Sequence, residues 1–139
     1  MPGYGPGSEN KSKESFTGSL PSIIDVISYS KDHKQLYGLL QKASLINALK
    51  GADNITMFAP ISLAFKNIPI ESLSKTELKS LLLGHVLQYS KSPPPNHLKM
   101  KSFKTLSNSR IDSSKVHKYM KNGIQTRNGV LFVTDSLIL

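Results

Sequence analysis

Apolar residues recur at helical spacing in the first half of the chain, whereas the second half carries short strand-like runs between turn signals. Two capping-box patterns, which begin at Ser22 and Asp32, each precede an apolar run. A third run at residues 45–49 is followed by Gly51, which fits the left-handed position that closes many helices. This pattern predicts three short helices at the start of the folded region.

The middle of the chain alternates between strand and helix signals. Residues 54–60 are rich in strand-forming side chains and end at a proline, so they are predicted to form a buried strand. Ser62 is expected to cap a short helix. The strongest capping box of the sequence, residues 74–77, opens a leucine-rich helix, and residues 84–87 are predicted to leave that helix in extended form.

Helix signals end at the proline-rich segment 92–96, which is expected to form a stiff surface loop. Asn128-Gly129 is typical of a tight hairpin turn, because both residue types tolerate positive φ. Strand-like runs are found at residues 100–106, 111–119, 124–126 and 130–133. Helices first and strands later predict an α+β fold, rather than an α/β fold in which the two alternate.

The length of 139 residues is typical of one domain, and the sequence has no internal repeat. We expect residues 1–19, which are rich in glycine, proline and serine, to form a flexible leader and residues 20–139 to form a single domain. The leader lacks the apolar centre of a signal peptide, and no stretch reaches the ~18 apolar residues of a membrane helix. We therefore expect no membrane insertion by this chain, and a secretion signal or anchor would lie outside it.

The formal net charge of +9 is concentrated in one segment. Residues 91–127 contain nine basic residues and one acidic residue, which gives this segment +8 and leaves +1 for the rest of the chain. Such a surface attracts polyanions at long range, although many charged runs are simply solvated. We define the basic face as its candidate polyanion-binding residues: Lys99, Lys101, Lys104, Arg110, Lys115, Lys118 and Lys121.

Two classes of partner fit this charge. An acidic, heparin-like polysaccharide would be held by exposed cations, and its binding should weaken steeply with salt. Nucleic acid is the weaker alternative. Phe103 and Tyr119 could stack on bases, but the sequence has neither a recognition-helix pattern nor an RNA-binding aromatic signature.

The sequence offers no catalytic or metal-binding pattern. It contains no cysteine, which excludes disulfides, thiol nucleophiles and cysteine-based zinc sites. His33, His97 and His117 lack the spacing of metal ligands, and no nucleophile motif or phosphate-binding loop is present. Asp25 and Asp135 lie far apart, so they are expected to act as a helix cap and a turn acceptor. We therefore expect no enzyme activity, no metal and no cofactor.

Three segments resemble the motifs of the fasciclin domain family, in the family's order and spacing. Residues 56–65, TMFAPISLAF, resemble the first signature T-x-F-A-P-T-[ND]-x-A-F. Residues 78–87, LKSLLLGHVL, resemble the central L-x-x-x-L-x-Y-H-V, and residues 128–139, NGVLFVTDSLIL, resemble the closing N-G-V-[IV]-H-V-[IV]-D-x-V-L. Four positions depart from these motifs. Ile61 stands where the family has Thr, and Ser62 stands where it has Asn or Asp. Gly84 replaces the Tyr of the central motif, and Phe132 replaces the His of the closing motif.

The resemblance implies a compact fold in which a wedge-shaped β-sandwich packs against several helices. It also implies a monomeric, non-enzymatic interaction module, outside the cell or at its surface, for cell adhesion or matrix-protein binding. The expected partner is a cell-surface or matrix protein, such as an integrin-like receptor. By their place in the motifs, the candidate interaction residues are Gly84, His85, Val86 and Leu87, and the structural motif residues are Phe58, Ala59, Pro60, Ser62 and Phe65.

His85 occupies the position of the central histidine of the motif. It is expected to be a buried, hydrogen-bonded side chain that ties the end of a helix to residues 58–65, with the hydroxyl of Ser62 or Thr56 as its partner. The alternative is direct contact with a binding partner. Under the first hypothesis, His85→Ala is expected to cost ~1–3 kcal/mol of stability.

The triplets N-I-T at residues 54–56 and N-K-S at residues 10–12 match the acceptor pattern for N-linked glycosylation. Because the first triplet runs into a predicted buried strand, a glycan at Asn54 is expected to be disfavoured. Asn10 lies in the predicted leader and is expected to be more accessible.

Overall fold

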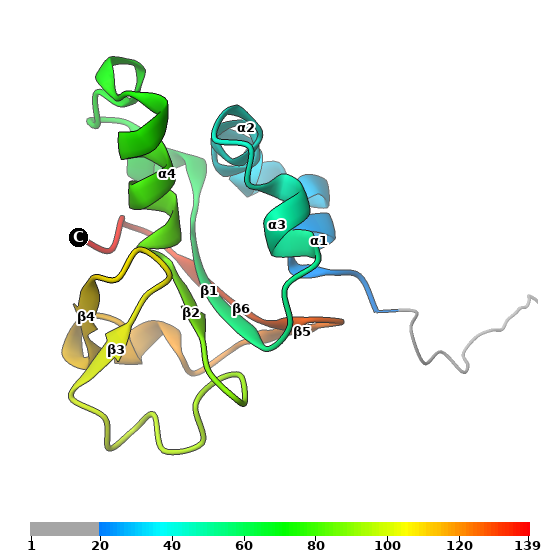
Figure 1. Ribbon diagram of the computed structural model, residues 1–139, viewed down its shortest axis with the longest axis vertical. Coiled ribbons are helices and arrows are strands. Elements are labelled where there is room, and N and C mark those ends of the chain that lie inside the picture. Colours follow the sequence, from blue (N-terminus) through cyan, green and yellow to red (C-terminus); the bar gives the residue numbers. More distant parts are fainter. Residues whose placement is uncertain (1–19) are drawn as a thin grey trace, which may run out of the picture.

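A computed structural model describes residues 20–139, and the predicted leader, residues 1–19, lies outside them (Figure 1). Within the described residues, three α-helices come first and five of the six strands follow the last α-helix, which confirms the predicted α+β class. The α-helices are α1 (Ile23–Tyr29), α2 (Lys34–Lys42), α3 (Ile46–Lys50) and α4 (Lys75–Leu83). Over residues 20–139, no helix is long and apolar enough to cross a membrane.

Helices α1 and α4 begin at capping boxes that the sequence predicted. The Ser22 hydroxyl accepts a hydrogen bond of 3.1 Å from the Asp25 backbone N–H, and the Asp25 carboxylate accepts one of 3.1 Å from the Ser22 N–H. Ser74 and Glu77 form the same pair of bonds at the start of α4, at 3.1 and 2.8 Å. These bonds satisfy donors that a helix leaves free at its start, and they lower the pKa of both carboxyl groups.

Helix α2 begins differently from the prediction. Asp32 does not cap it, because residues Lys31–His33 form a 3₁₀ turn that leads into the helix. The Ser62 hydroxyl, 27 residues away, accepts a bond of 3.1 Å from a first-turn donor of α2, the Gln35 N–H. Ser62 itself opens only a 3₁₀ turn, Ser62–Phe65, and its hydroxyl thus caps a neighbouring helix instead of its own.

The residues with a left-handed backbone around α3 differ from the one that the sequence predicted. Gly51 was predicted to be left-handed after α3, but its φ is −91°. Ser44, between α2 and α3, has a φ of 60°, and Asn54 has a φ of 55° at the entry to the first strand. The reversal after α3 is therefore made by an asparagine, a residue type that tolerates this conformation better than most.

The strands are β1 (Ile55–Pro60), β2 (Val86–Gln88), β3 (Ser102–Lys104), β4 (Arg110–Asp112), β5 (Ile124–Thr126) and β6 (Gly129–Thr134). The larger sheet has the order β2-β1-β6-β5, and the smaller sheet pairs β3 with β4. β1 and β6 are parallel, from Ile55↔Gly129 to Pro60↔Thr134, and the other pairs are antiparallel. β5 and β6 form the predicted hairpin, but its two turn residues are Arg127 and Asn128 and not Asn128 and Gly129, because Thr126 pairs with Gly129. Gly129 is the first residue of β6, and Asn128 does not have the positive φ that the prediction assumed.

The predicted strand at residues 111–119 is wrong beyond its start in β4. Two 3₁₀ turns follow, Ser113–Lys115 and His117–Tyr119. Buried side chains recur here every third residue, at Ser113 and Val116, which is the spacing of a 3₁₀ turn. A strand would bury every second residue.

β1 is buried on both faces, because the helices cover one face of the large sheet and the small sheet covers the other (Figure 1). Ile55, Met57 and Ala59 belong to the core that the sheet shares with the helices. Phe58 points the other way, into a second core with β3 and β4, where its ring stacks on Phe132 at 5.9 Å between centroids. The central strand thus joins two cores and cannot move without disturbing both.

The two sheets meet at β2. The Leu106 N–H donates to the Val86 carbonyl oxygen at 2.9 Å, and Leu87 forms an isolated antiparallel bridge with Thr105. β2 therefore bonds to β1 on one side and to the segment after β3 on the other. This junction holds the small sheet against the large one.

Candidate functional site

His85 lies where α4 gives way to β2, and 2% of its surface is exposed. Its Nδ1 is 2.9 Å from the Leu81 carbonyl oxygen, and its Nε2 accepts a bond of 2.9 Å from the Ile138 backbone N–H. A carbonyl oxygen can only accept and an amide N–H can only donate, so the imidazole is neutral with its proton on Nδ1. The side chain joins the last turn of α4 to a segment 53 residues further along the chain.

The predicted burial of His85 is confirmed, but its predicted partners are wrong. The hydroxyl of Thr56 pairs with the hydroxyl of Ser92, and the hydroxyl of Ser62 caps α2. Neither reaches the imidazole, whose two nitrogens are both taken by main-chain groups.

His33 makes the connection that was expected of His85. Its Nε2 donates to the Ala59 carbonyl oxygen at 3.0 Å, and its Nδ1 pairs with the Ser30 hydroxyl at 2.7 Å. This imidazole ties the start of α2 to the end of β1. Sequence reasoning missed the role because the strand partner lies 26 residues away and no local pattern marks it.

Burial lowers the pKa of His85 below its usual 6.5, and the bond to Leu81 opposes this shift only in part. The unfolded chain therefore binds more protons than the folded chain as the pH falls below about 6.5, so stability is lost in that range. We expect the unfolding free energy of the wild type to fall, relative to that of His85→Gln, by up to about 1.4 kcal/mol per pH unit below this point. Urea unfolding at a series of pH values measures the difference. Parallel profiles for the two proteins would contradict the buried neutral imidazole.

Three of the four candidate interaction residues lie inside the molecule, which corrects the expectation placed on them. His85, Val86 and Leu87 have exposed fractions of 2%, 0% and 0%. Val86 packs in the core with the helices and Leu87 in the core with the small sheet, because β2 is covered on both faces. Gly84 is partly exposed but offers no side chain. The side chains of His85, Val86 and Leu87 therefore pack within the fold and do not lie on its surface.

The structural motif residues also serve the interior. Phe58, Ala59, Pro60 and Phe65 are buried, and Ser62 is half-buried with its hydroxyl on α2. The first signature is therefore a packing and capping unit around the end of β1.

Asn128 is a structural centre that sequence reasoning missed. Its side chain is buried, with 7% exposed, and Oδ1 accepts a bond of 3.0 Å from the Ile23 N–H. Nδ2 donates to the carbonyl oxygens of Leu49 and Ala52 at 2.9 and 2.8 Å, and the Asn128 carbonyl oxygen accepts from the Ile55 N–H at 3.1 Å. One residue thus joins the hairpin to α1, to the end of α3 and to β1. The Asn-Gly pair signals a turn, but it does not reveal these distant partners.

All seven residues of the basic face are exposed. On the small sheet, Lys104 stands directly opposite Arg110. Phe103 and Ile111, their inward neighbours, are buried, so the two cations share the outer surface. Like charges in opposite positions repel, which an anion bound between them would relieve. Arg110 also donates to the Ser102 hydroxyl at 3.0 Å.

Few carboxylates offset this charge. Within residues 20–139, the one salt bridge joins Lys50 to Asp25 at 3.4 Å, between α3 and α1, and it does not involve the basic face. Asp135 accepts a bond of 2.5 Å from the Tyr119 hydroxyl, and this bond, with a smaller contribution from Lys118, lowers its pKa. Within the described residues, no cation of the basic face therefore forms a salt bridge.

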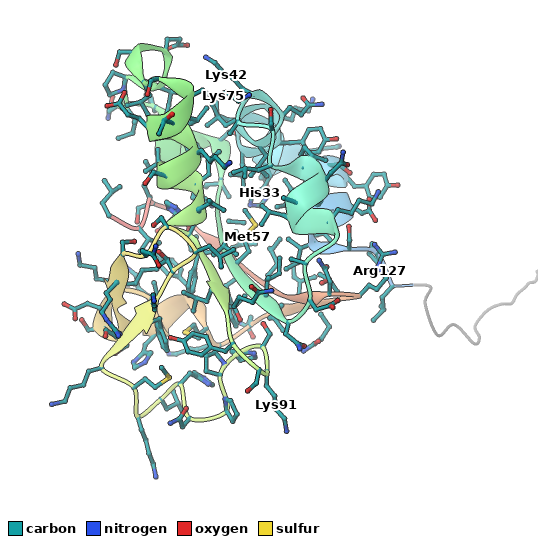
Figure 2. All side chains as sticks on the ribbon, viewed as in Figure 1. His33, Lys42, Met57, Lys75, Lys91 and Arg127 are labelled. Carbon is teal, nitrogen blue, oxygen red and sulfur yellow. The ribbon has the colours of Figure 1, made fainter. Side chains whose placement is uncertain are left out.

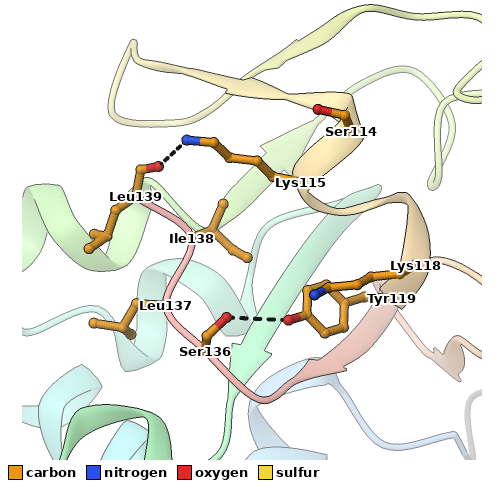
Figure 3. A pocket seen from close by; sticks show the side chains of 8 residues that line it. All are labelled: Ser114, Lys115, Lys118, Tyr119, Ser136, Leu137, Ile138 and Leu139. Atoms are coloured by element: carbon orange, nitrogen blue, oxygen red, sulfur yellow. Dashed lines mark hydrogen bonds between the residues drawn. The ribbon is translucent and has the colours of Figure 1, made fainter.

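A surface cavity of about 370 Å³ lies between the two 3₁₀ turns and the last described residues (Figure 3). Lys115 donates to the Leu139 carbonyl oxygen at 2.7 Å, and the Lys118 ammonium lies 5.0 Å from the centre of the Tyr119 ring. The polar lining consists of ammonium and hydroxyl groups: Ser114, Lys115, Lys118, Tyr119 and Ser136. Such a lining suits an anion or a polyol. Among residues 20–139, no three His, Asp or Glu side chains gather as metal ligands.

The sequence matches the family model of the Fasciclin domain over residues 31–139. The chain belongs to the fasciclin domain family. Among solved structures, it is similar to a FAS1 domain pair from the insect cell adhesion molecule Fasciclin I, with 12% sequence identity and a TM-score of 0.63. That match covers 86% of this chain and 51% of the insect chain. No curated protein matches the sequence.

The structural likeness confirms the fasciclin-type α+β fold, in which two sheets that meet at β2 pack against helices. Fasciclin domains are modules associated with cell adhesion, and they occur in extracellular or cell-surface proteins. This fasciclin domain spans about half the length of the insect chain, which contains a pair of such domains.

Proposed function

We propose that this fasciclin domain is a non-enzymatic interaction module of an extracellular or cell-surface protein, and that it binds a cell-surface or matrix protein through the basic face. The two buried histidines, His33 and His85, are both used inside the fold, where ring nitrogens of both bond to main-chain groups. All seven cations of the basic face, in contrast, are exposed, and Asp112 is the one acidic residue of the segment 91–127. The observation that carries the proposal is that the two buried histidines bond to the main chain, whereas the basic face is exposed to solvent.

The positive charge of the basic face indicates that a protein partner would present an acidic surface. An acidic patch, as on an integrin-like receptor or a matrix protein, would be steered toward the basic face and held in register by its exposed cations. The association rate should therefore fall as salt rises, since exposed charges are screened beyond about 10 Å at 0.1 M salt.

An acidic polysaccharide is the second candidate, and a specific observation favours it. The cavity beside the basic face combines the ammonium groups of Lys115 and Lys118 with three hydroxyl groups. Ammonium groups pair with sulfate or carboxylate, and hydroxyls pair with sugar hydroxyls, so one surface can serve both features of an acidic sugar.

Neutralising part of the basic face is expected to weaken binding to immobilised heparin by roughly tenfold at low salt, since each exposed ion pair contributes a fraction of a kcal/mol. The variant replaces Lys99, Lys101 and Lys104 with Gln. A matched control replaces Lys34, Lys42 and Lys75 with Gln, because α2 and the start of α4, which carry them, lie at the end of the molecule away from β3, which carries Lys104 (Figure 1). Both variants remove three charges from +9. Equal losses for the two variants would show that net charge, and not the basic face, governs binding.

Cell attachment to the immobilised domain separates the two partners. If the partner is a protein, mild protease treatment of the cells abolishes attachment, and a glycosaminoglycan lyase leaves it unchanged. If the partner is a polysaccharide, the lyase abolishes it. Attachment that is equal for the wild type and the Lys99, Lys101 and Lys104 variant would reject the basic face as the binding surface for either partner.

A further inference from the structure

Asn54 makes the turn between α3 and β1, and it is exposed. Its left-handed φ of 55° places it outside the strand, and burial begins at the next residue, Ile55, with 0% exposed. The triplet 54–56 does run into a buried strand, as expected, but the strand starts one residue later than predicted and leaves Asn54 outside it.

The hydrogen bonds around this turn are made by the neighbours of Asn54. Gln88 donates from Nε2 to the Asp53 carbonyl oxygen at 3.0 Å, and the Ser92 hydroxyl donates to the Ile55 carbonyl oxygen at 2.6 Å. Within residues 20–139, no hydrogen bond holds the side-chain amide of Asn54. The amide is thus free to carry a substituent without loss of a bond that the fold needs.

The surface beside Asn54 has room for that substituent. An open groove of about 320 Å³ borders it, and the β5–β6 hairpin forms one side, with Arg127 at its tip (Figure 2). The side chains that line the groove with Asn54 include Asp53, Ser92, Gln125 and Arg127. These polar groups can bond to sugar hydroxyls, and no apolar packing is displaced.

Thr56 completes the Asn-x-Thr acceptor pattern, but the folded domain conceals it. Thr56 is 2% exposed, and its hydroxyl pairs with that of Ser92. An enzyme that reads the asparagine and the threonine together would find only the asparagine on the folded domain. Modification must therefore precede the enclosure of β1.

We infer that Asn54 is a site of N-linked glycosylation, modified before the domain folds and exposed afterwards. The donor is an oligosaccharide carried on a lipid diphosphate. A bond forms between Nδ2 of Asn54 and the anomeric carbon of the sugar, the bond from that carbon to the diphosphate oxygen breaks, and Nδ2 loses one proton as the lipid diphosphate leaves. The inference rests on the extracellular setting proposed above, and it is independent of what the basic face binds.

Secretion of the whole chain from eukaryotic cells behind a cleavable signal peptide tests the site. In an Asn10→Gln background, which removes the other acceptor pattern, the secreted protein is expected to carry the mass of one oligosaccharide. A peptide N-glycosidase should remove that mass and, in heavy-oxygen water, label residue 54. Adding Asn54→Asp, which tolerates the left-handed backbone, should give the unmodified mass throughout. A folded Asn10→Gln protein secreted without a glycan would overturn the inference. The supplied signal makes this result independent of the natural location.

A second experiment tests the order of events. Purified oligosaccharyltransferase and a lipid-linked donor are given the bacterially produced domain, either folded or held unfolded in mild denaturant that the enzyme tolerates. We expect modification of Asn54 to be at least about tenfold faster in the unfolded chain, in line with the concealment of Thr56 in the fold. Equal rates would show that the folded turn is itself an acceptor, and would overturn the proposed order.

Discussion

Replacing Gly129 with alanine is expected to prevent folding, or to lower the free energy of unfolding by more than about 4 kcal/mol. A Cβ at this position would lie 1.8 Å from the Ile55 carbonyl oxygen and 2.8 Å from its carbonyl carbon. Neither strand can move aside, because these two residues are partners in the parallel β1–β6 pair. The φ of 156° adds strain that an alanine backbone does not tolerate.

Circular dichroism during urea unfolding measures this loss, and the chain offers a matched glycine as a control. Gly38 lies in α2, and no heavy atom comes within 4 Å of a Cβ placed there. Gly38→Ala is expected to be neutral or to stabilise the domain by about 0.5–1 kcal/mol, because alanine loses less backbone freedom in a helix. A Gly129→Ala protein that unfolds cooperatively near the wild-type midpoint would contradict the close approach of β1 and β6.

Asn128→Ala is expected to lower the free energy of unfolding by about 3 kcal/mol. The substitution leaves the Ile23 N–H and the carbonyl oxygens of Leu49 and Ala52 without their partner in a buried setting. Each unsatisfied buried group costs about 1–3 kcal/mol, and partial entry of water keeps the total below the sum. Equilibrium urea unfolding, fitted with a two-state transition, gives the value.

Asn47→Ala is the matched control for this amide. Asn47 is exposed on α3, and its side chain forms no hydrogen bond within residues 20–139, so its loss should change stability by less than about 0.5 kcal/mol. Asn128→Asp should be more damaging than Asn128→Ala near neutral pH, since a carboxylate would face two carbonyl oxygens where the amide donates. If Asn128→Ala matches Asn47→Ala, the amide does not hold the helices to the hairpin.

The features that the sequence predicted correctly are local ones. The capping boxes at Ser22 and Ser74 were found because both partners lie within three residues. The β5–β6 hairpin was found from a local turn signal, although its turn lies one residue earlier than the Asn-Gly pair indicated. The capping of α2 by Ser62 could not be found in this way, since the hydroxyl arrives from a segment 27 residues later. Local patterns carry no information about such distant pairs.

The candidate site also has parts that local sequence predicts and parts that only the three-dimensional structure reveals. The basic face was predicted from composition alone, and its exposure follows from the tendency of charged side chains to stay solvated. The opposition of Lys104 and Arg110 required the β3–β4 register, which no local pattern fixes. Val86 and Leu87 were assigned to a binding surface because of their place in a motif, whereas a strand enclosed between two cores can present neither.

The parallel pairing of β1 with β6 has a consequence for biosynthesis. β1 begins at residue 55, but its parallel partner begins at residue 129, so a nascent chain exposes a strand that the fold buries along its whole length until residue 129 and those after it have been made. At the usual speed of a ribosome this interval is roughly 4–15 s, long enough for aggregation unless chaperones shield the strand. During the same interval Thr56 is not yet enclosed by the sheet, so the inferred modification of Asn54 has time to occur before folding is complete.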